Sequence, residues 1–364
     1  MSSREFFEIL NQIDEDSEIT LEYLEKGRKE AERVSCELAN TRQTLDDLDE
    51  QFQKATGLTG ADTIFLFLAI GLQMVRQYLV PNDAFRMTAQ QGDAMMEQML
   101  SLTPPKWQDV LLQSVPYDAI MTGPHISNTG ISGTTHRYRT LGHDPLLGWI
   151  FGTANIMTNS LTKTDLVTYQ VNMATHQIVR HYPLGVAGMF QKAVEYTEKD
   201  PRLLAAAVVR QAIHFGSDYF TKQGLPVPII AMVDNDLAKK MLTQWHLDVY
   251  SISRSAMLAS FINLLISLIH SLFYKGIGDI DQKLYEVRTR KIISYSNLVA
   301  SGANAIVVAG TKDISRLDVG GMATTIYNLI TNAEFKRNVK QEFIFGTYYN
   351  RIKGDGSYLY IPEE

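Results

Sequence analysis

The chain has 364 residues, 45% of them hydrophobic and 20% charged, so it can bury one large core or two ordinary ones. Its formal net charge of −6 argues against a dedicated nucleic-acid-binding protein, because such proteins carry a strongly basic face. Cys36 is the single cysteine, which excludes an intramolecular disulfide and a zinc site built from several thiolates. The N-terminal residues lack a basic stretch followed by an apolar run. Together these features predict a cytoplasmic protein.

Residues 21–52 are rich in charged and amide side chains and carry apolar residues at heptad spacing. Two seams alternate along the segment: Leu24, Ala31, Leu38, Leu45 and Phe52 form one, and Val34, Thr41 and Leu48 the other. This pattern predicts a coiled-coil or helical-hairpin arm over residues 1–56, through which two copies of the chain would form a homo-oligomer. The alternative is a helix that packs on its own domain.

Two later segments are strongly apolar. Residues 62–80 contain Gln73 and Arg76, and a charge at the centre of a membrane helix costs roughly 2.5–3.5 kcal/mol, so we expect a buried core helix there. Residues 256–273 carry no charge and are barely long enough to span a membrane. Serine and asparagine recur along one face of this segment. A core helix is therefore favoured, and membrane contact through residues 256–273 is the alternative.

The remaining sequence predicts helices around one polar loop. Residues 115–144 are dense in Gly, Ser, Thr and Asn, and loops of this length inside a compact domain are often functional. The sequence shows no regular alternation of strand patterns with helical ones, so we predict an all-α fold. Its parts are the arm, a helical domain over residues 57–345 and an irregular tail or small hairpin over residues 346–364.

Histidines and aspartates gather in the middle of the chain. His136 and His143 bracket a basic stretch of the loop, and Asp144 follows directly. His214 and Asp218 are four residues apart, so a helix would place both on one face. Imidazole and carboxylate groups are common ligands of divalent metals, and a bound metal lowers the pKa of a water ligand.

These residues define a predicted site with assigned roles. The predicted ligands of a divalent metal ion, zinc or manganese, are His136, His143, His214 and Asp218. The candidate catalytic carboxylates are Asp144 and Asp218. The candidate substrate-binding groups, whose hydroxyl and guanidinium donors suit phosphate or another anion, are Thr135, Arg137 and Arg139.

Structural alternatives to this site remain open. Asp144 would also serve as the cap of a helix that begins near Leu146. His214 and Asp218 would also make a structural hydrogen bond, and the loop itself would also be a purely structural element.

The two histidine motifs resemble those of a known family. His136-Arg137 followed by His143, together with the later His214, Asp218, Thr221 and Gly224, is similar to the motif pair of the bacterial membrane-bound metal-dependent hydrolases under LexA control. The resemblance covers these two patches and implies a metal-dependent hydrolase.

Two functions follow from the sequence. The first is a metal-dependent hydrolase that acts on a phosphate ester or similar anionic substrate. The second is a non-enzymatic, self-associating helical scaffold or effector that docks on a membrane. The chain has no Walker, dinucleotide-binding or G-x-S-x-G motif, which argues against those enzyme classes. Convergence of His136 and His214 in the folded chain would favour the enzyme.

Overall fold

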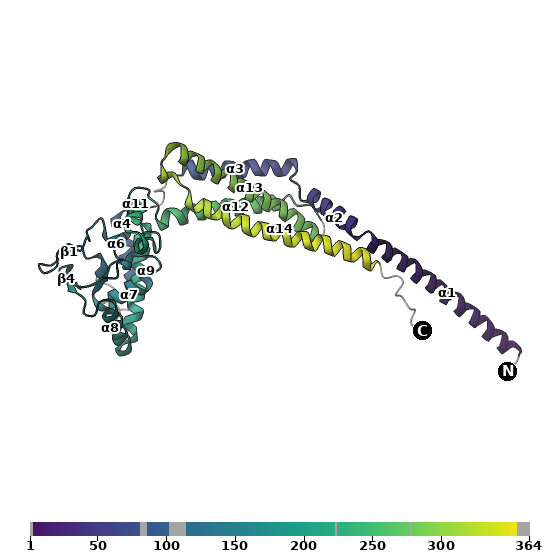
Figure 1. Cartoon of the computed structure of the whole chain (residues 1–364), viewed down its shortest axis with the longest axis horizontal. Coiled ribbons are helices and arrows are strands. Elements are labelled where there is room, and N and C mark those ends of the chain that lie inside the picture. The colour runs from purple at the N-terminus through teal and green to yellow at the C-terminus, as the bar shows by residue number, and fades with distance from the viewer. Residues whose placement is uncertain (1–2, 81–85, 102–113, 223, 277–278, 355–364) are drawn as a thin grey trace. The chain divides into compact units, whose positions relative to one another are not determined.

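The structure is a computed structural model that describes residues 3–80, 86–101, 114–222, 224–276 and 279–354. It is mostly α-helical, as the sequence predicts, with one small sheet (Figure 1). Contacts divide the chain into two compact units. Unit 1 comprises Met1–Ala69, Asn263–Ser296 and Ile326–Glu364, and unit 2 comprises Ile70–Ile262 and Asn297–Thr325.

The N-terminal arm of unit 1 consists of two helices with different surroundings. None of the residues of α1 (Ser3–Ala39) is buried, whereas α2 (Thr41–Ala55) buries Leu48 and Phe52 on one face. Phe52 packs with apolar residues from later parts of unit 1. The second half of the heptad pattern therefore packs on the chain's own domain. Self-association through α1 stays a prediction.

Four longer helices have residues in both units: α3 (Gly60–Leu79), α12 (Val249–Ser271), α13 (Asp279–Thr311) and α14 (Val319–Lys353). The predicted boundaries after residues 56 and 345 therefore do not coincide with the two units. The predicted irregular tail is helical as far as Lys353 because α14 continues through it. The rest of the predicted tail or small hairpin, residues 355–364, lies outside the described residues.

The expectation of buried core helices at residues 62–80 and 256–273 is wrong. Much of the apolar surface of α3 and α12 is exposed, at Ile64, Phe67, Leu79, Met257, Phe261, Leu264 and Leu268. α12 and α13 are long and apolar enough to cross a membrane, and 28% of the apolar window of α12 is buried. α2 and α3 pass the same test together but are bent by 56°.

Unit 2 contains a four-stranded sheet that the sequence did not predict. The strands are β1 (Met121–Thr122), β2 (Ser160–Thr162), β3 (Thr168–Asn172) and β4 (Gln177–His181), in the order β1-β4-β3-β2. β2, β3 and β4 pair antiparallel, and β1 runs parallel to β4. The core beside the sheet includes Tyr117, Leu161 and Ile178, all fully buried.

Helices of unit 2 pack around this core: α7 (Gly148–Thr158), α8 (Gly185–Lys199) and α9 (Pro201–Phe220) (Figure 1). α9 begins where the Asp200 carboxylate accepts the Arg202 amide and Pro201 takes the first helical position. Gly148 and Gly152 let α7 approach α9, because a Cβ at Gly148 would collide with Phe215 and one at Gly152 with Gln211. This contact sets the face that α9 turns to the loop.

Shorter elements complete unit 2: α4 (Ala89–Ser101), η2 (Pro116–Asp118), α6 (His136–Arg139), η3 (Leu141–His143), α10 (Ile230–Val233), α11 (Asn235–Thr243) and η4 (Ile314–Arg316). Three of them, η2, α6 and η3, lie within residues 115–144 together with β1. The segment predicted as one polar loop therefore contains short ordered turns, and these turns carry the candidate ligands.

Candidate metal centre

Three histidines and two aspartates of unit 2 converge on one place. They come from three short turns and one long helix: Asp118 ends η2, His136 begins α6, His143 ends η3, and His214 and Asp218 lie one turn apart on α9. We call these five residues the His–Asp cluster. Four of them are the predicted metal ligands, and the structure brings all four together.

The distances inside the His–Asp cluster centre on two carboxylate oxygens. Asp118 Oδ1 lies 2.9 Å from His143 Nε2 and 3.8 Å from Nε2 of both His136 and His214. Asp218 Oδ2 lies 3.2 Å from His214 Nε2 and 3.7 Å from His143 Nε2. Two groups, one of Asp118, His136 and His143 and one of His143, His214 and Asp218, could each hold a metal ion.

The two shortest separations, 2.9 and 3.2 Å, suit ligands of a common ion, and the other three, of 3.7–3.8 Å, would shorten around a metal. Two ligand atoms about 2.1 Å from one metal are about 3.0–3.4 Å apart at octahedral or tetrahedral angles. In addition, His214 Nε2 and Asp218 Oδ2 are buried and have no hydrogen-bond partner among the described residues. These two atoms lie 3.2 Å from each other and form a buried ion pair when His214 carries a proton. A cation between them would take the place of that proton.

Hydrogen bonds at Nδ1 orient two of the histidines. His136 Nδ1 lies 3.1 Å from the Ser132 carbonyl oxygen, to which it can only donate. In His136 the proton is therefore on Nδ1, and the Nε2 lone pair faces the cluster. His143 Nδ1 is hydrogen-bonded to Thr140 Oγ1 at 2.7 Å. His143 Nε2 lies 2.9 Å from Asp118 Oδ1, so without a metal it donates to that carboxylate.

Arg137 positions one of the carboxylates. Its Nη2 lies 2.7 Å from Asp218 Oδ1, and its Nη1 donates to the Gly224 carbonyl oxygen at 3.0 Å. Asp218 is thereby oriented with Oδ2 toward the histidines. Both terminal nitrogens of Arg137 are engaged, which does not fit the predicted substrate-binding role.

The other two predicted substrate-binding residues stabilise the loop. Thr135 Oγ1 donates to the Gly130 carbonyl oxygen at 2.9 Å and accepts the Ser132 amide at 2.8 Å. The Arg139 guanidinium packs against Gly130, whose positive φ of 71° and lack of a Cβ allow the contact. The structure therefore does not assemble Thr135, Arg137 and Arg139 into one anion site.

Asp144 lies outside the His–Asp cluster. Its Oδ1 accepts the Leu146 and Leu147 amides at 3.0 and 2.9 Å, and its Oδ2 accepts the Ile229 amide at 2.5 Å. The buried carboxylate thus caps the start of α7 and attaches the segment before α10. This arrangement fits the helix-cap alternative and not the predicted catalytic role.

Sequence reasoning missed Asp118 and the residues that brace the imidazoles. The Tyr117 ring packs against those of His143 and His214, at centroid distances of 4.9 and 5.3 Å. Its hydroxyl donates to Gln211 Oε1, and Gln211 Nε2 donates to the Gly142 carbonyl oxygen. The sequence feature that could have indicated them is the tyrosine and aspartate that follow Pro116 at the start of the polar loop.

Burial and charge set the protonation of the metal-free cluster. Burial lowers the pKa of His143 to about 4, so this side chain is neutral at pH 7. Burial would also lower the pKa of His214, but Asp218 and Asp118 outweigh it and raise that pKa. Burial would raise the pKa of Asp218, yet His214 and Arg137 bring it down to about 2. A metal ion would replace the proton that these carboxylates stabilise on His214.

Solvent reaches the cluster mainly at Asp118. Its side chain is 35% exposed and that of His136 is 12% exposed, whereas His143, His214 and Asp218 are buried.

Comparisons with protein-family models, curated proteins and solved structures found no match to this chain. The resemblance to the LexA-controlled hydrolases stays a hypothesis that rests on the motif residues themselves.

Proposed function

We propose that the chain is a metal-dependent hydrolase that acts on a phosphate ester or similar anionic substrate. The observation that carries the proposal is the convergence of five potential ligands, in two overlapping groups that could each hold a metal ion. A bound zinc or manganese ion would supply a Lewis acid for the phosphoryl oxygen and would lower the pKa of a water ligand.

The protein residues contribute positioning and selectivity in this proposal. Tyr117 and the Nδ1 hydrogen bonds keep the imidazoles facing inward, and Arg137 orients Asp218. Burial of His143, His214 and Asp218 keeps bulk water from that side of the cluster, and water and substrate would enter beside the more exposed Asp118. The convergence of His136 and His214 beside Asp118 favours this function over a purely structural scaffold.

The metal content of the purified full-length chain tests the proposal. We expect near-stoichiometric zinc or manganese by inductively coupled plasma mass spectrometry in the wild type and none in His214→Ala. His125→Ala is the matched control, because His125 is an exposed histidine outside the cluster, and it should retain the metal. Wild-type protein that stays metal-free after zinc and manganese are supplied would remove the basis for a hydrolase.

We also propose that the apolar helices attach the chain to a membrane. Residues 255–274, from α12 and the residues after it, and residues 292–311 of α13 are each twenty residues without Asp, Glu, Lys or Arg. About twenty apolar residues span the hydrocarbon core of a bilayer. Exposed Phe261, Leu264 and Leu268 have no apolar cover in the described residues, which lipid would provide.

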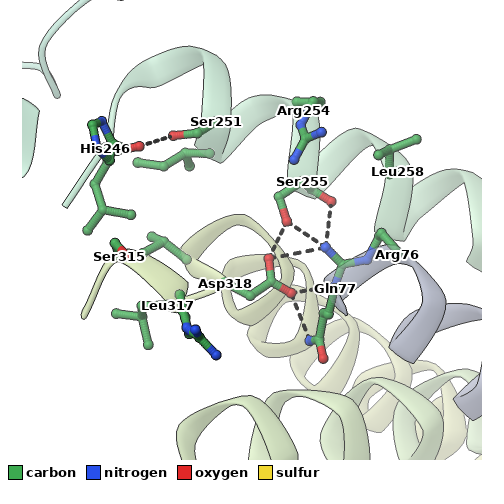
Figure 2. A pocket seen from close by; sticks show the side chains of 14 residues that line it. Arg76, Gln77, His246, Ser251, Arg254, Ser255, Leu258, Ser315, Leu317 and Asp318 are labelled. Atoms are coloured by element: carbon green, nitrogen blue, oxygen red, sulfur yellow. Dashed lines mark hydrogen bonds and ion pairs between the residues drawn. The ribbon is translucent and has the colours of Figure 1, made fainter. Parts of the chain in front are cut away.

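The charge within α3 does not oppose this proposal. Arg76 is paired with Asp318 and also donates to Ser255, and both charged side chains are at least nine-tenths buried (Figure 2). Gln77 donates to the same carboxylate. A charge that is paired and faces other helices is tolerated in a membrane bundle far better than an isolated one.

Fractionation tests the membrane attachment. The expressed chain should sediment with membranes and resist extraction by alkaline carbonate, yet dissolve in mild detergent. A chain that is monodisperse in the soluble fraction without detergent would contradict the proposal.

A further inference from the structure

The helix that carries two metal ligands ends against the beginning of an apolar helix. Tyr219 directly follows the ligand Asp218, and its hydroxyl is hydrogen-bonded to Ser253 Oγ on α12 at 2.5 Å. The Tyr219 ring also packs on Tyr250 at a centroid distance of 5.3 Å. All of these residues belong to unit 2.

A buried arginine strengthens the same junction. Arg86 Nη1 donates to the Thr221 carbonyl oxygen just after α9, and its Nη2 pairs with Asp248 just before α12 at 2.6 Å. Its guanidinium also lies over the Tyr250 ring, 4.6 Å from the centroid. The Arg86 and Asp248 side chains are almost completely buried, so this is a desolvated ion pair with fixed geometry. The end of α9 and the first turn of α12 therefore form one block.

The apolar surface begins at this block. The charge-free segment of α12 starts at residue 255, two residues after Ser253, and exposed Met257 and Phe261 follow within it. If these residues enter a bilayer, the His–Asp cluster is held at the membrane–water boundary. Lipid phosphates lie at that boundary.

We infer that the substrate is a phosphate ester carried by a membrane lipid. This inference rests on the proposed hydrolase function and on the membrane attachment of α12. In the reaction the oxygen of water forms the new bond to phosphorus, and the bond between phosphorus and the diacylglycerol oxygen breaks. The departing oxygen takes one proton from water, so phosphatidic acid and water give diacylglycerol and inorganic phosphate.

Paired lipids that differ only in acyl length test the inference. The detergent-solubilised full-length chain, with zinc or manganese supplied, is assayed on dioleoyl phosphatidic acid and dioleoyl phosphatidylglycerol in dodecylmaltoside mixed micelles. The matched probes are the water-soluble dihexanoyl forms, which carry the same phosphate esters. We measure diacylglycerol release while the mole fraction of lipid in the micelle surface varies at constant bulk concentration.

We expect the rate to follow the surface mole fraction for the dioleoyl lipids. Their kcat/KM should exceed that of the dihexanoyl forms by about 10²-fold, the scale on which tethering raises effective concentration. His214→Ala should release no diacylglycerol, which excludes a contaminating enzyme.

Other outcomes overturn the inference in distinguishable ways. Equal kcat/KM for both acyl lengths, without surface dependence, overturns the lipid inference and leaves the hydrolase standing. Cleavage of bis(p-nitrophenyl) phosphate by the metal-loaded chain, with all four lipids intact, likewise overturns the lipid inference and leaves the hydrolase standing. Failure to cleave any of these esters with metal bound overturns the hydrolase proposal together with the inference.

Discussion

Replacement of Arg137 by leucine tests whether the His–Asp cluster binds metal through a preoriented carboxylate. Arg137 is the partner of Asp218 Oδ1 and also satisfies the Gly224 carbonyl oxygen. Without the guanidinium, Asp218 loses the contact that points Oδ2 at the histidines. Its pKa should also rise, because burial then acts against a weaker set of positive neighbours.

The expected loss of affinity follows from this geometry. Removing a residue that orients a metal ligand typically lowers metal affinity by about 10–100-fold, or about 1.4–2.7 kcal/mol. Breaking a buried ion pair from one side costs about 3–5 kcal/mol of stability. Because the Arg137 side chain is 14% exposed, we expect the lower end, about 3 kcal/mol. Zinc affinity is measured by competition with a chromophoric chelator, and stability by thermal unfolding of metal-free protein.

Two variants control this measurement. Arg139→Leu changes the same residue type two positions along α6 without touching Asp218, so zinc affinity should stay within about threefold of wild type. Arg137→Lys keeps the charge but loses the two-pronged geometry of the guanidinium, so its zinc affinity should lie between that of wild type and that of Arg137→Leu. Folded Arg137→Leu protein that binds zinc as tightly as wild type would refute the reasoning.

Three further outcomes are expected. Asp144→Ala should lower stability by about 2 kcal/mol through the lost cap while metal stoichiometry is unchanged; loss of metal instead would make Asp144 part of the site. In metal-free protein, NMR should show the pKa of His143 near 4, below the ordinary histidine pKa of 6.5. The stability that the folded protein gains from keeping this ring neutral is therefore fully present above pH 6.5 and is lost as the pH falls toward 4. A pKa at or above 6.5 would contradict its burial. Deletion of residues 1–39 should convert an oligomer into a monomer by light scattering, and an unchanged mass would exclude self-association through α1.

Much of the candidate site could be read from the sequence. His214 and Asp218 share a helix face because their spacing of four matches the helical repeat. His136 and His143 stood out because histidines in a polar loop have the ligand chemistry of a metal site. Asp118 could not be identified in this way, because nothing in a short turn after Pro116 indicates which distant residues it meets. The sequence predicts Arg137 as a substrate-binding residue, whereas its contact with Asp218 depends on the docking of the loop on α9.

The fold shows the same division between local and distant information. Helices were predicted because apolar residues repeat at the helical period over ten or more residues. The strands were missed because they are two to five residues long, and their pairing joins segments without a period of their own.

The sequence by itself determined the helical class, the side-chain types of the candidate metal ligands and the length of the charge-free segments. Each of these depends on residue identity and local spacing. The tertiary structure decided which side chains are covered. Apolar residues such as Phe261 in α12 have the composition of a protein core, yet they remain exposed because the neighbouring helices contact other faces. It also decided that Asp144 caps a helix while Asp118 completes the cluster, because either aspartate has the same chemistry until its neighbours are known.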